Sequence, residues 1–357
     1  MQLRILKHPG FFLLLLTAIC FFLTPVLAHV PAFGGEGENP ESAVLIENAA
    51  KSWVFYGQIA SEDLKYYAFK MEKGERIVLG LTVPIEEVDQ GFTPNLILMG
   101  PGLEDEGRAP EGLEVPDGYG AKVLSYGMPE SPVYEGFTPS AFYSLARLDM
   151  EAPESGIYYA AVGAVHGADI TGGETVPERE VPSEGNYGMV LGYRETFTLK
   201  EWITVPLSQI RVYRWEGQSL YLIFTPLALT LAAGFLAIYL KKETVAGLSP
   251  ARMSGILAGL FFLGTGASYI FQMLMSLSKS SYSPEIAITV VLILSSIGLG
   301  VASITLSLKN ETYGGGSARK RFYFFSLGIV GLLLWAGWFI GPLLAFEAAL
   351  LPWKRKE

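Results

Sequence analysis

A run of 22 residues without a charged side chain, 219–240, constrains this chain more than any other part of its sequence. At about 1.5 Å per residue, a helix of this length spans roughly the ~30 Å hydrocarbon core of a bilayer. Two lysines, Lys241 and Lys242, follow it directly. The run therefore predicts a membrane-spanning helix, and it divides the chain into a long N-terminal region and a shorter C-terminal one.

The net charge of the chain changes sign at this division. Residues 29–215 contain 29 Asp and Glu against 13 Lys and Arg, whereas residues 216–357 contain 6 acidic and 11 basic residues. An acidic soluble region repels phosphate backbones, so we expect no nucleic-acid partner. Because Cys20 is the single cysteine, the region after it has no disulfide, no cysteine nucleophile and no cysteine-ligated metal.

Residues 1–28 are typical of a signal peptide. A short basic segment precedes an apolar stretch at 11–23, and small residues end the segment at Ala28. An uncleaved first membrane helix is the alternative. Cleavage after Ala28 makes His29 the first residue of the mature chain, followed by a Gly-, Pro- and Glu-rich stretch, 29–50, that we expect to form an extended arm.

Residues 51–200 carry the signals of an all-β domain. Short β-branched and aromatic runs alternate with Gly and Pro, and no long stretch combines helical periodicity with caps. The first predicted strands are 54–59, 66–71, 76–83 and 95–99. Short strands at this spacing favour an antiparallel sandwich of two sheets with few helices.

Several motifs follow one another within residues 52–193. They are Tyr66-Tyr67-x-Phe69, Lys73-Gly74-Glu75 before a strand, Asn95-Leu96-Ile97-Leu98, Gly156-Ile157-Tyr158-Tyr159 and Gly185-Asn186-Tyr187-Gly188. In this order they resemble the pre-peptidase C-terminal domain of bacteria and archaea, and the resemblance implies a small, jelly-roll-like β-sandwich. The chain departs from that pattern in a long insertion at 101–153, and no peptidase accompanies the domain, so a role in assisting a protease is not carried over.

The insertion at 101–153 is too long for a plain sandwich loop and is rich in aromatic residues as well as proline. We expect it to pack along the sandwich and to present a ligand-binding surface. A cap that covers the sheet edges is the alternative. The aromatic candidates for ligand binding are Tyr119, Tyr126, Tyr134, Phe137, Phe142 and Tyr143.

Four membrane spans are predicted within a helical region at 219–351. Their approximate bounds are 219–240, 253–277, 285–308 and 322–344. The segment before them, 201–218, is expected to lie at the membrane surface. Its aromatic residues fit an interfacial belt that includes Trp202, Tyr213, Trp215 and Tyr221.

The basic loops 241–252 and 309–321 predict the orientation of these spans. By the positive-inside rule both loops are cytoplasmic, which places the β domain outside the cell. The basic tail, 352–357, conflicts with this assignment because a chain with four spans would end outside. The last apolar stretch is longer than one crossing and contains Gly341-Pro342, so it either crosses once and ends at the interface or folds back.

The predicted spans contain no central ionisable residue, which disfavours a transporter or an ion channel. Two small-residue motifs, at Gly255 and Gly259 and at Gly337 and Gly341, allow helices to approach closely. We interpret them as packing within one bundle, with a helix–helix partner in the membrane as the alternative.

Two histidines, His29 and His166, remain after the predicted cleavage. The terminal amine and imidazole of His29, joined by the ring of His166, would form a histidine brace, a nitrogen donor set that suits Cu(II). The alternative is that His29 belongs to a mobile arm and His166 to a solvated turn.

Three acidic clusters offer oxygen ligands for calcium, although none has the spacing of a defined calcium loop. They are Glu36-x-Glu38, Glu86-Glu87-x-Asp89 and Glu104-Asp105-Glu106. A solvated acidic surface is the alternative. The sequence contains no nucleophile elbow, phosphate-binding loop or zinc-protease motif, so we expect no enzymatic activity.

The sequence thus predicts a multi-pass protein of the cell membrane with an all-β, jelly-roll-like extracellular sandwich followed by an all-α, four-helix transmembrane region. The first functional hypothesis is a non-enzymatic binding module that meets an envelope component or a partner protein. The second is a copper-binding domain that uses His29 and His166. The third is an accessory subunit of a membrane complex, because a single span would be enough for an anchor.

Overall fold

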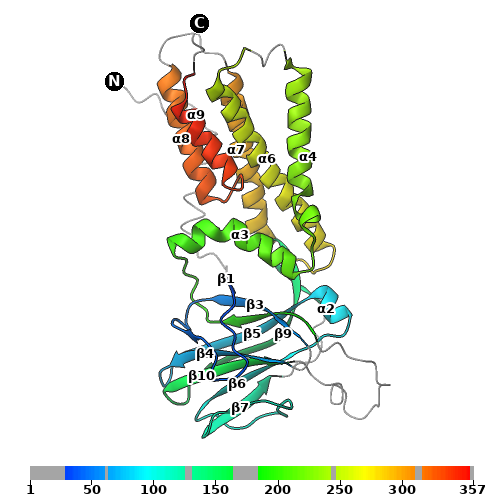
Figure 1. Ribbon diagram of the computed structural model, residues 1–357, viewed down its shortest axis with the longest axis vertical. Coiled ribbons are helices and arrows are strands. Elements are labelled where there is room, and N and C mark those ends of the chain that lie inside the picture. The colour runs from blue at the N-terminus through cyan, green and yellow to red at the C-terminus, as the bar shows by residue number, and fades with distance from the viewer. Residues whose placement is uncertain are drawn as a thin grey trace.

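The computed structural model describes residues 29–60, 63–124, 131–163, 184–242, 247–309 and 316–353. A β-rich region with two sheets comes first and a helical region follows, with helix α3 (Leu199–Trp215) lying across the boundary between them (Figure 1). The predicted signal peptide, 1–28, lies outside the described residues.

The two sheets of the β-rich region form a sandwich-like arrangement. The six-stranded sheet has the order β1 (Val30–Phe33), β3 (Trp53–Ile59), β11 (Gly185–Leu191), β5 (Arg76–Pro84), β9 (Ser140–Glu151), β8 (Val133–Glu135). The five-stranded sheet has the order β2 (Leu45–Ile46), β4 (Leu64–Met71), β10 (Gly156–Gly163), β6 (Asn95–Pro101), β7 (Tyr119–Leu124). The pairs β1–β3 and β2–β4 are parallel and the other pairs are antiparallel.

Side chains from both sheets fill the space between them. Because successive strand residues point to opposite faces, Tyr158 of β10 enters this central core while the adjacent Tyr159 faces outward. The hydroxyls of Tyr67 in β4 and Tyr187 in β11 form a hydrogen bond of 2.8 Å that joins the two sheets through the core. The expected β-rich region is therefore present, and the helix within its described residues is the short α2 (Ile85–Asp89).

Two segments for which no strands were predicted, the extended arm and the insertion, contribute strands. The arm at 29–50 contains β1 and β2, which form one edge of each sheet. The insertion at 101–153 contains β7, β8 and β9, and β9 is a 12-residue strand between β5 and β8. Gly and Pro lower the local strand signal, but pairing with neighbouring strands outweighs that propensity once the sheets form.

Three helices are long and apolar enough to cross a membrane: α4 (Leu220–Leu240), α6 (Pro250–Leu277) and α7 (Ile286–Leu308). They agree with the first three predicted spans to within a few residues. Where α6 packs on α7, a Cβ on Gly259 would fall 2.9 Å from the carbonyl oxygen of Gly300. The motif at Gly255 and Gly259 therefore packs helices of the same chain against each other.

The predicted fourth span, 322–344, is not one helix, which corrects the sequence analysis. α8 (Gly316–Leu333) and α9 (Ile340–Leu350) are separated by a turn at 334–339. Gly337 has a positive φ of 84°, and Pro342 lies in the first turn of α9. Proline has no backbone N–H, and the N–H groups in the first turn of a helix have no acceptor within that helix. Pro342 is therefore compatible with the start of a new helix but not with the interior of a continuous one.

α8 and α9 form an antiparallel hairpin. Gly331 lies against Pro342 near the turn, and the rings of Phe324 and Trp353 are 5.2 Å apart at the other end. At that end Lys320 also donates a hydrogen bond of 2.6 Å to the carbonyl of Lys309, just after α7. The hairpin therefore returns the chain to the end of the helical region that is distant from the sheets (Figure 1).

Candidate functional site

The β-rich and helical regions meet in a buried contact that we call the seam. The described side chains that form it come from β8, the residues after β8, α3, α6, the start of α7 and the 334–339 turn. Its principal residues are Tyr134, Gly136, Phe137, Gln209, Trp215, Tyr269, Glu285, Thr289 and Trp335.

Trp215, the last residue of α3, attaches this helix to the six-stranded sheet. Its indole N–H donates a hydrogen bond of 2.9 Å to the carbonyl of Tyr187, and the Asn186 amide donates one of 3.0 Å to the carbonyl of Trp215. The ring packs edge-on against Tyr56, with centroids 4.9 Å apart. A buried tryptophan with its polar atom satisfied is a strong anchor, because it combines a large apolar area with a directional bond.

A second attachment joins the end of β8 to the first turns of α7. Gly136 donates its backbone N–H to the Glu285 carboxyl group at 3.2 Å, and its carbonyl accepts the Thr289 hydroxyl at 2.6 Å. The same hydroxyl oxygen lies 2.7 Å from the buried hydroxyl of Tyr134. The backbone of Glu285 leaves no space for a side chain at Gly136, so only glycine permits this approach.

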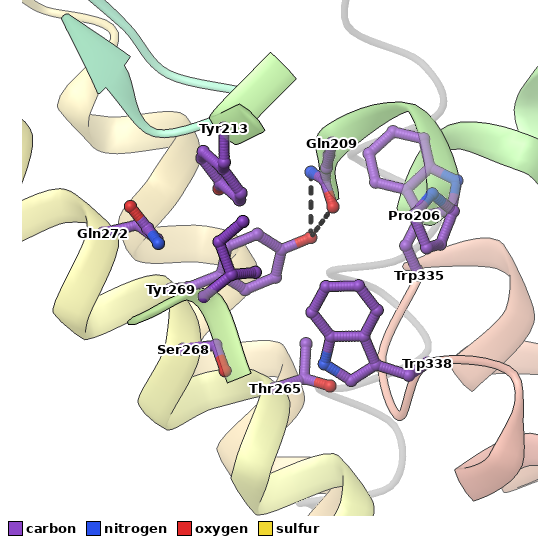
Figure 2. Close-up of a pocket in the computed structure, with 10 residues that line it drawn as sticks. Pro206, Gln209, Tyr213, Thr265, Ser268, Tyr269, Gln272, Trp335 and Trp338 are labelled. Carbon is purple, nitrogen blue, oxygen red and sulfur yellow. Dashed lines mark hydrogen bonds between the residues drawn. The ribbon is translucent and has the colours of Figure 1, made fainter. Parts of the chain in front are cut away.

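A third attachment is centred on Gln209 of α3 (Figure 2). Its amide nitrogen donates to the carbonyl of Phe137 at 3.0 Å, and its amide group also contacts the Tyr269 hydroxyl of α6 at 3.3–3.4 Å. The cavity beside these groups is about 10 Å³, which is room for about one water molecule. The buried polar groups therefore serve to join segments rather than to receive an organic ligand.

The turn at 334–339 is strained. Trp335, Trp338 and Phe339 have φ values of 55°, 52° and 62°, and among the described residues they are the non-glycine residues with positive φ. Each such residue costs about 1 kcal/mol or more, so the turn persists only because surrounding contacts hold it.

α3 provides those contacts through Trp202, which accepts one hydrogen bond from the turn and donates another to the end of α8. The indole N–H of Trp335 donates to the carbonyl of Trp202 at 2.8 Å, and the Trp202 indole donates to the carbonyl of Leu333 at 3.2 Å. The two rings lie 4.5 Å apart, and Trp335 also packs edge-on against Phe137. The turn of the α8–α9 hairpin is thus stabilised by α3, the helix that also contacts the six-stranded sheet.

Three partly buried carboxyl groups lie along the seam. Burial, together with the neighbouring Glu285 carboxylate, raises the pKa of Glu135 to about 8. Burial also raises the pKa of Glu216 to about 8 and increases that of Glu285. With pKa values of about 8, Glu135 and Glu216 are largely protonated at neutral pH, which weakens the repulsion between carboxylates where the two regions meet.

A second cavity, of about 80 Å³, lies at the α2 side of the seam. Its lining includes Glu216, Glu86 and Lys279, and the last two are 3.4 Å apart as an ion pair. Among the described residues no group of three His, Cys, Asp or Glu side chains is arranged to hold a metal ion.

The predicted aromatic candidates do not form one external surface. Tyr134 and Phe137 are buried in the seam, where they have no face for an external ligand. Phe142 lies against Trp215, with ring centroids 6.5 Å apart. These residues of the insertion join the sandwich to the helices instead.

The remaining aromatic candidates lie elsewhere. Tyr143 packs against the core between the sheets, and Tyr126 lies outside the described residues. Tyr119 of β7 is half-exposed on the five-stranded sheet, 6.2 Å from the ring of Tyr159 in β10. Among the candidates that the structure describes, Tyr119 is the one with an accessible ring beside a second aromatic residue of that sheet.

The structure describes one of the two histidines that were predicted to bind copper. The Nδ1 of His29 lies 2.6 Å from the Ser52 hydroxyl, whereas His166 falls outside the described residues. In the acidic clusters, Asp105 accepts a hydrogen bond from the backbone of Ala121, and Glu106 pairs with Lys122. These carboxylates have protein partners, and copper and calcium binding stay predictions.

Sequence reasoning missed most of the polar residues of the seam. A signal for them exists in α6, where four polar residues at spacings of three and four occupy one face of an otherwise apolar helix. They are Thr265, Ser268, Tyr269 and Gln272. A polar stripe within a predicted span indicates a face turned toward protein rather than lipid.

Comparison of the sequence with family models and with curated proteins found no match: no family model matches the chain, and no curated protein is significantly similar to it in sequence. The resemblance to the pre-peptidase C-terminal domain therefore remains a prediction from the motifs alone.

Proposed function

We propose that this chain is a non-enzymatic binding protein of the cell membrane, with its β-sandwich outside and its helices embedded in the lipid. The observation that carries the proposal is the seam. Its hydrogen bonds and buried rings hold the sandwich in a fixed position on the helices. A sandwich that is held rigidly on the helices presents the same surface to a partner at a constant distance from the membrane.

The distribution of basic residues supports the outside location of the sandwich. The end of the helical region distant from the sheets carries Lys241, Lys242, Arg252 and Lys309. The hairpin of α8 and α9 brings the segment that precedes the basic tail to this same end, next to Lys320. A membrane region with three spans and a returning hairpin thus has most of its basic groups on one side, with Lys279 at the other end, as the positive-inside rule requires of a cytoplasmic face.

The surface we propose for partner binding is the part of the outward face of the five-stranded sheet that other segments leave uncovered; this sheet is the one farther from the helices (Figure 1). It carries the half-exposed rings of Tyr119 and Tyr159, and Ile157 is 39% exposed beside them. Tyrosine side chains are enriched among residues that dominate binding energies, because they are rigid and have both an apolar ring and a polar hydroxyl.

The test is the capture of partners from solubilised membranes by the full-length protein and by its Tyr119→Ala variant. A binding residue of this kind contributes about 2 kcal/mol, so capture should fall roughly thirtyfold. Tyr282→Ala is the matched control, because Tyr282 is an exposed tyrosine of the α6–α7 loop. Equal capture of the same proteins or polymers by all three forms would refute the proposed surface.

A second candidate function, an accessory subunit of a membrane complex, is favoured by α4. Only 6% of the residues in its most apolar stretch are buried inside the protein, compared with 67% for the corresponding stretch of α6. Among the helices, α4 packs mainly on α6, so most of its surface is available to helices of another protein. Cross-linking from Leu236 in native membranes tests this candidate, which predicts one specific protein adduct rather than lipid adducts alone.

The copper hypothesis has a separate test. N-terminal sequencing of the purified protein shows whether His29 is the first residue, and metal analysis before and after a His166→Ala substitution shows whether copper is held by both histidines. A chain that begins elsewhere, or copper content unchanged by the substitution, would refute the histidine brace.

A further inference from the structure

All strongly exposed side chains of α3 lie on one face of this helix. At about 100° per residue, these positions fall within an arc of roughly 120°. They are Leu199, Lys200, Ile203, Leu207, Arg211 and Arg214. The three apolar members are 75%, 43% and 53% exposed, and the half-buried Ile210 lies among them on the helical wheel.

The opposite faces of α3 are occupied by protein. Trp215 is buried against the sandwich, Val205 and Gln209 are buried toward α6 and the 334–339 turn, and Val212 is buried as well. α3 lies across the ends of the candidate spans and leads directly into α4 (Figure 1). Its exposed face is therefore level with the ends of the candidate spans that lie nearest the sandwich.

The exposed face of α3 is also positively charged. The one acidic residue within the helix, Glu201, is paired with Lys51 at 2.7 Å on another side. Arg211 lies over the ring of Phe33 at 3.6 Å, and Arg214 donates one hydrogen bond to the carbonyl of Gln218. Since a guanidinium group has five N–H donors, both arginines retain donors for a phosphate group.

We propose that this face of α3 binds the surface of the membrane in which the spans are embedded, and that it prefers anionic lipids. Leu199, Ile203 and Leu207 contact the acyl chains, while the basic side chains bind the phosphates of the headgroups. A helix with an apolar row and basic residues beside it, continuous with a membrane span, has the chemistry of an interfacial helix. The inference rests on the membrane location of the proposed function, and it adds a lipid-binding surface to it.

The first test measures the depth of α3 in the bilayer. Single cysteines at Ile203 and Leu207, in full-length protein carrying Cys20→Ser, are labelled with bimane and reconstituted into nanodiscs that contain brominated lipids. We expect quenching comparable with that of a label at Leu236 in α4, and none at Asp117 in the sandwich. Quenching at Leu236 without quenching on α3 refutes this inference alone, whereas no quenching at Leu236 refutes the membrane location itself.

The second test measures the lipid preference. Brominated phosphatidylglycerol should quench the α3 labels more than brominated phosphatidylcholine at the same mole fraction. Replacing Lys200, Arg211 and Arg214 by Gln should reduce this preference at least roughly fivefold, since each basic side chain near an anionic surface contributes about that factor. The conservative Arg211→Lys and Arg214→Lys variants should retain it. Equal quenching by both lipids in the unmodified protein would overturn the preference for anionic lipids.

Discussion

Thr289 is the residue on which the contact between β8 and α7 depends. A threonine hydroxyl has one hydrogen, and here it is directed to the carbonyl of Gly136. The oxygen must therefore accept the hydrogen of Tyr134 at 2.7 Å. One buried hydroxyl thus satisfies two groups from the other region, and its removal leaves both without a partner.

Thr289→Val is consequently expected to destabilise the protein more than Tyr134→Phe does. The tyrosine variant loses one hydrogen bond, at about 1 kcal/mol, whereas the valine variant also leaves a buried donor and acceptor unsatisfied, at about 1–3 kcal/mol each. The midpoints of thermal unfolding in detergent, measured for both single variants and the double variant, check this. Strictly additive shifts would contradict a direct bond between the two side chains.

Glu135 gives the seam a pH dependence whose sign follows from its raised pKa. Between the ordinary value of 4.5 and the folded-state value of about 8, the folded chain retains a proton that the unfolded chain has released. Stability therefore falls as the pH rises through this window. Glu135→Gln, which cannot ionise, should flatten the decrease in melting temperature between roughly pH 5 and pH 8. An unchanged slope would show that Glu135 is already ionised in the folded protein.

At the scale of elements, α6 and α7 depend on glycine where their backbones meet. The Cβ of an alanine at position 259 would press against Ile304 and the Gly300 carbonyl oxygen, which lies in rigid helix backbone. At Gly234 of α4, by contrast, the nearest atoms belong to the flexible end of Leu260. These two glycines therefore form a matched pair for testing helix packing.

We expect Gly259→Ala to lower the thermal unfolding midpoint and Gly234→Ala to leave it equal or slightly higher. The reason is that alanine favours the helix by about 1 kcal/mol over glycine, and only the clash at position 259 outweighs this gain. Differential scanning fluorimetry in the same detergent compares the two variants. A stabilised Gly259→Ala variant would indicate that α6 and α7 approach each other less closely at Gly259 than they do in this structure.

The 334–339 turn shows why the sequence did not distinguish a fourth span from a chain that folds back. The stretch 322–344 is apolar enough for one span, and hydropathy does not distinguish a crossing helix from a hairpin. Reversal requires positive φ at Trp335, Trp338 and Phe339, which propensity alone does not favour. Contacts from α3 stabilise that conformation, and they become visible only in the folded molecule.

At the scale of the whole molecule, the hairpin makes a prediction about the position of the tail. Single cysteines at Lys242 and Pro352 should both be protected from a membrane-impermeant maleimide in intact cells, while one at Asp117 should react. All three positions are exposed on the protein surface, so their reactivity reports the side of the membrane. Reaction at Pro352 without reaction at Lys242 would restore a fourth crossing.

The sequence by itself determined the division into a β-rich and an apolar helical region, three of the long helices and most of the first strands. These features depend on local periodicity and hydropathy, which short windows of sequence contain. Only the tertiary structure decided the roles of Gln209, Tyr269 and Thr289, and it alone placed Tyr134 and Phe137 inside the seam. Such contacts join residues more than 50 positions apart, and no local pattern specifies which distant surfaces will meet.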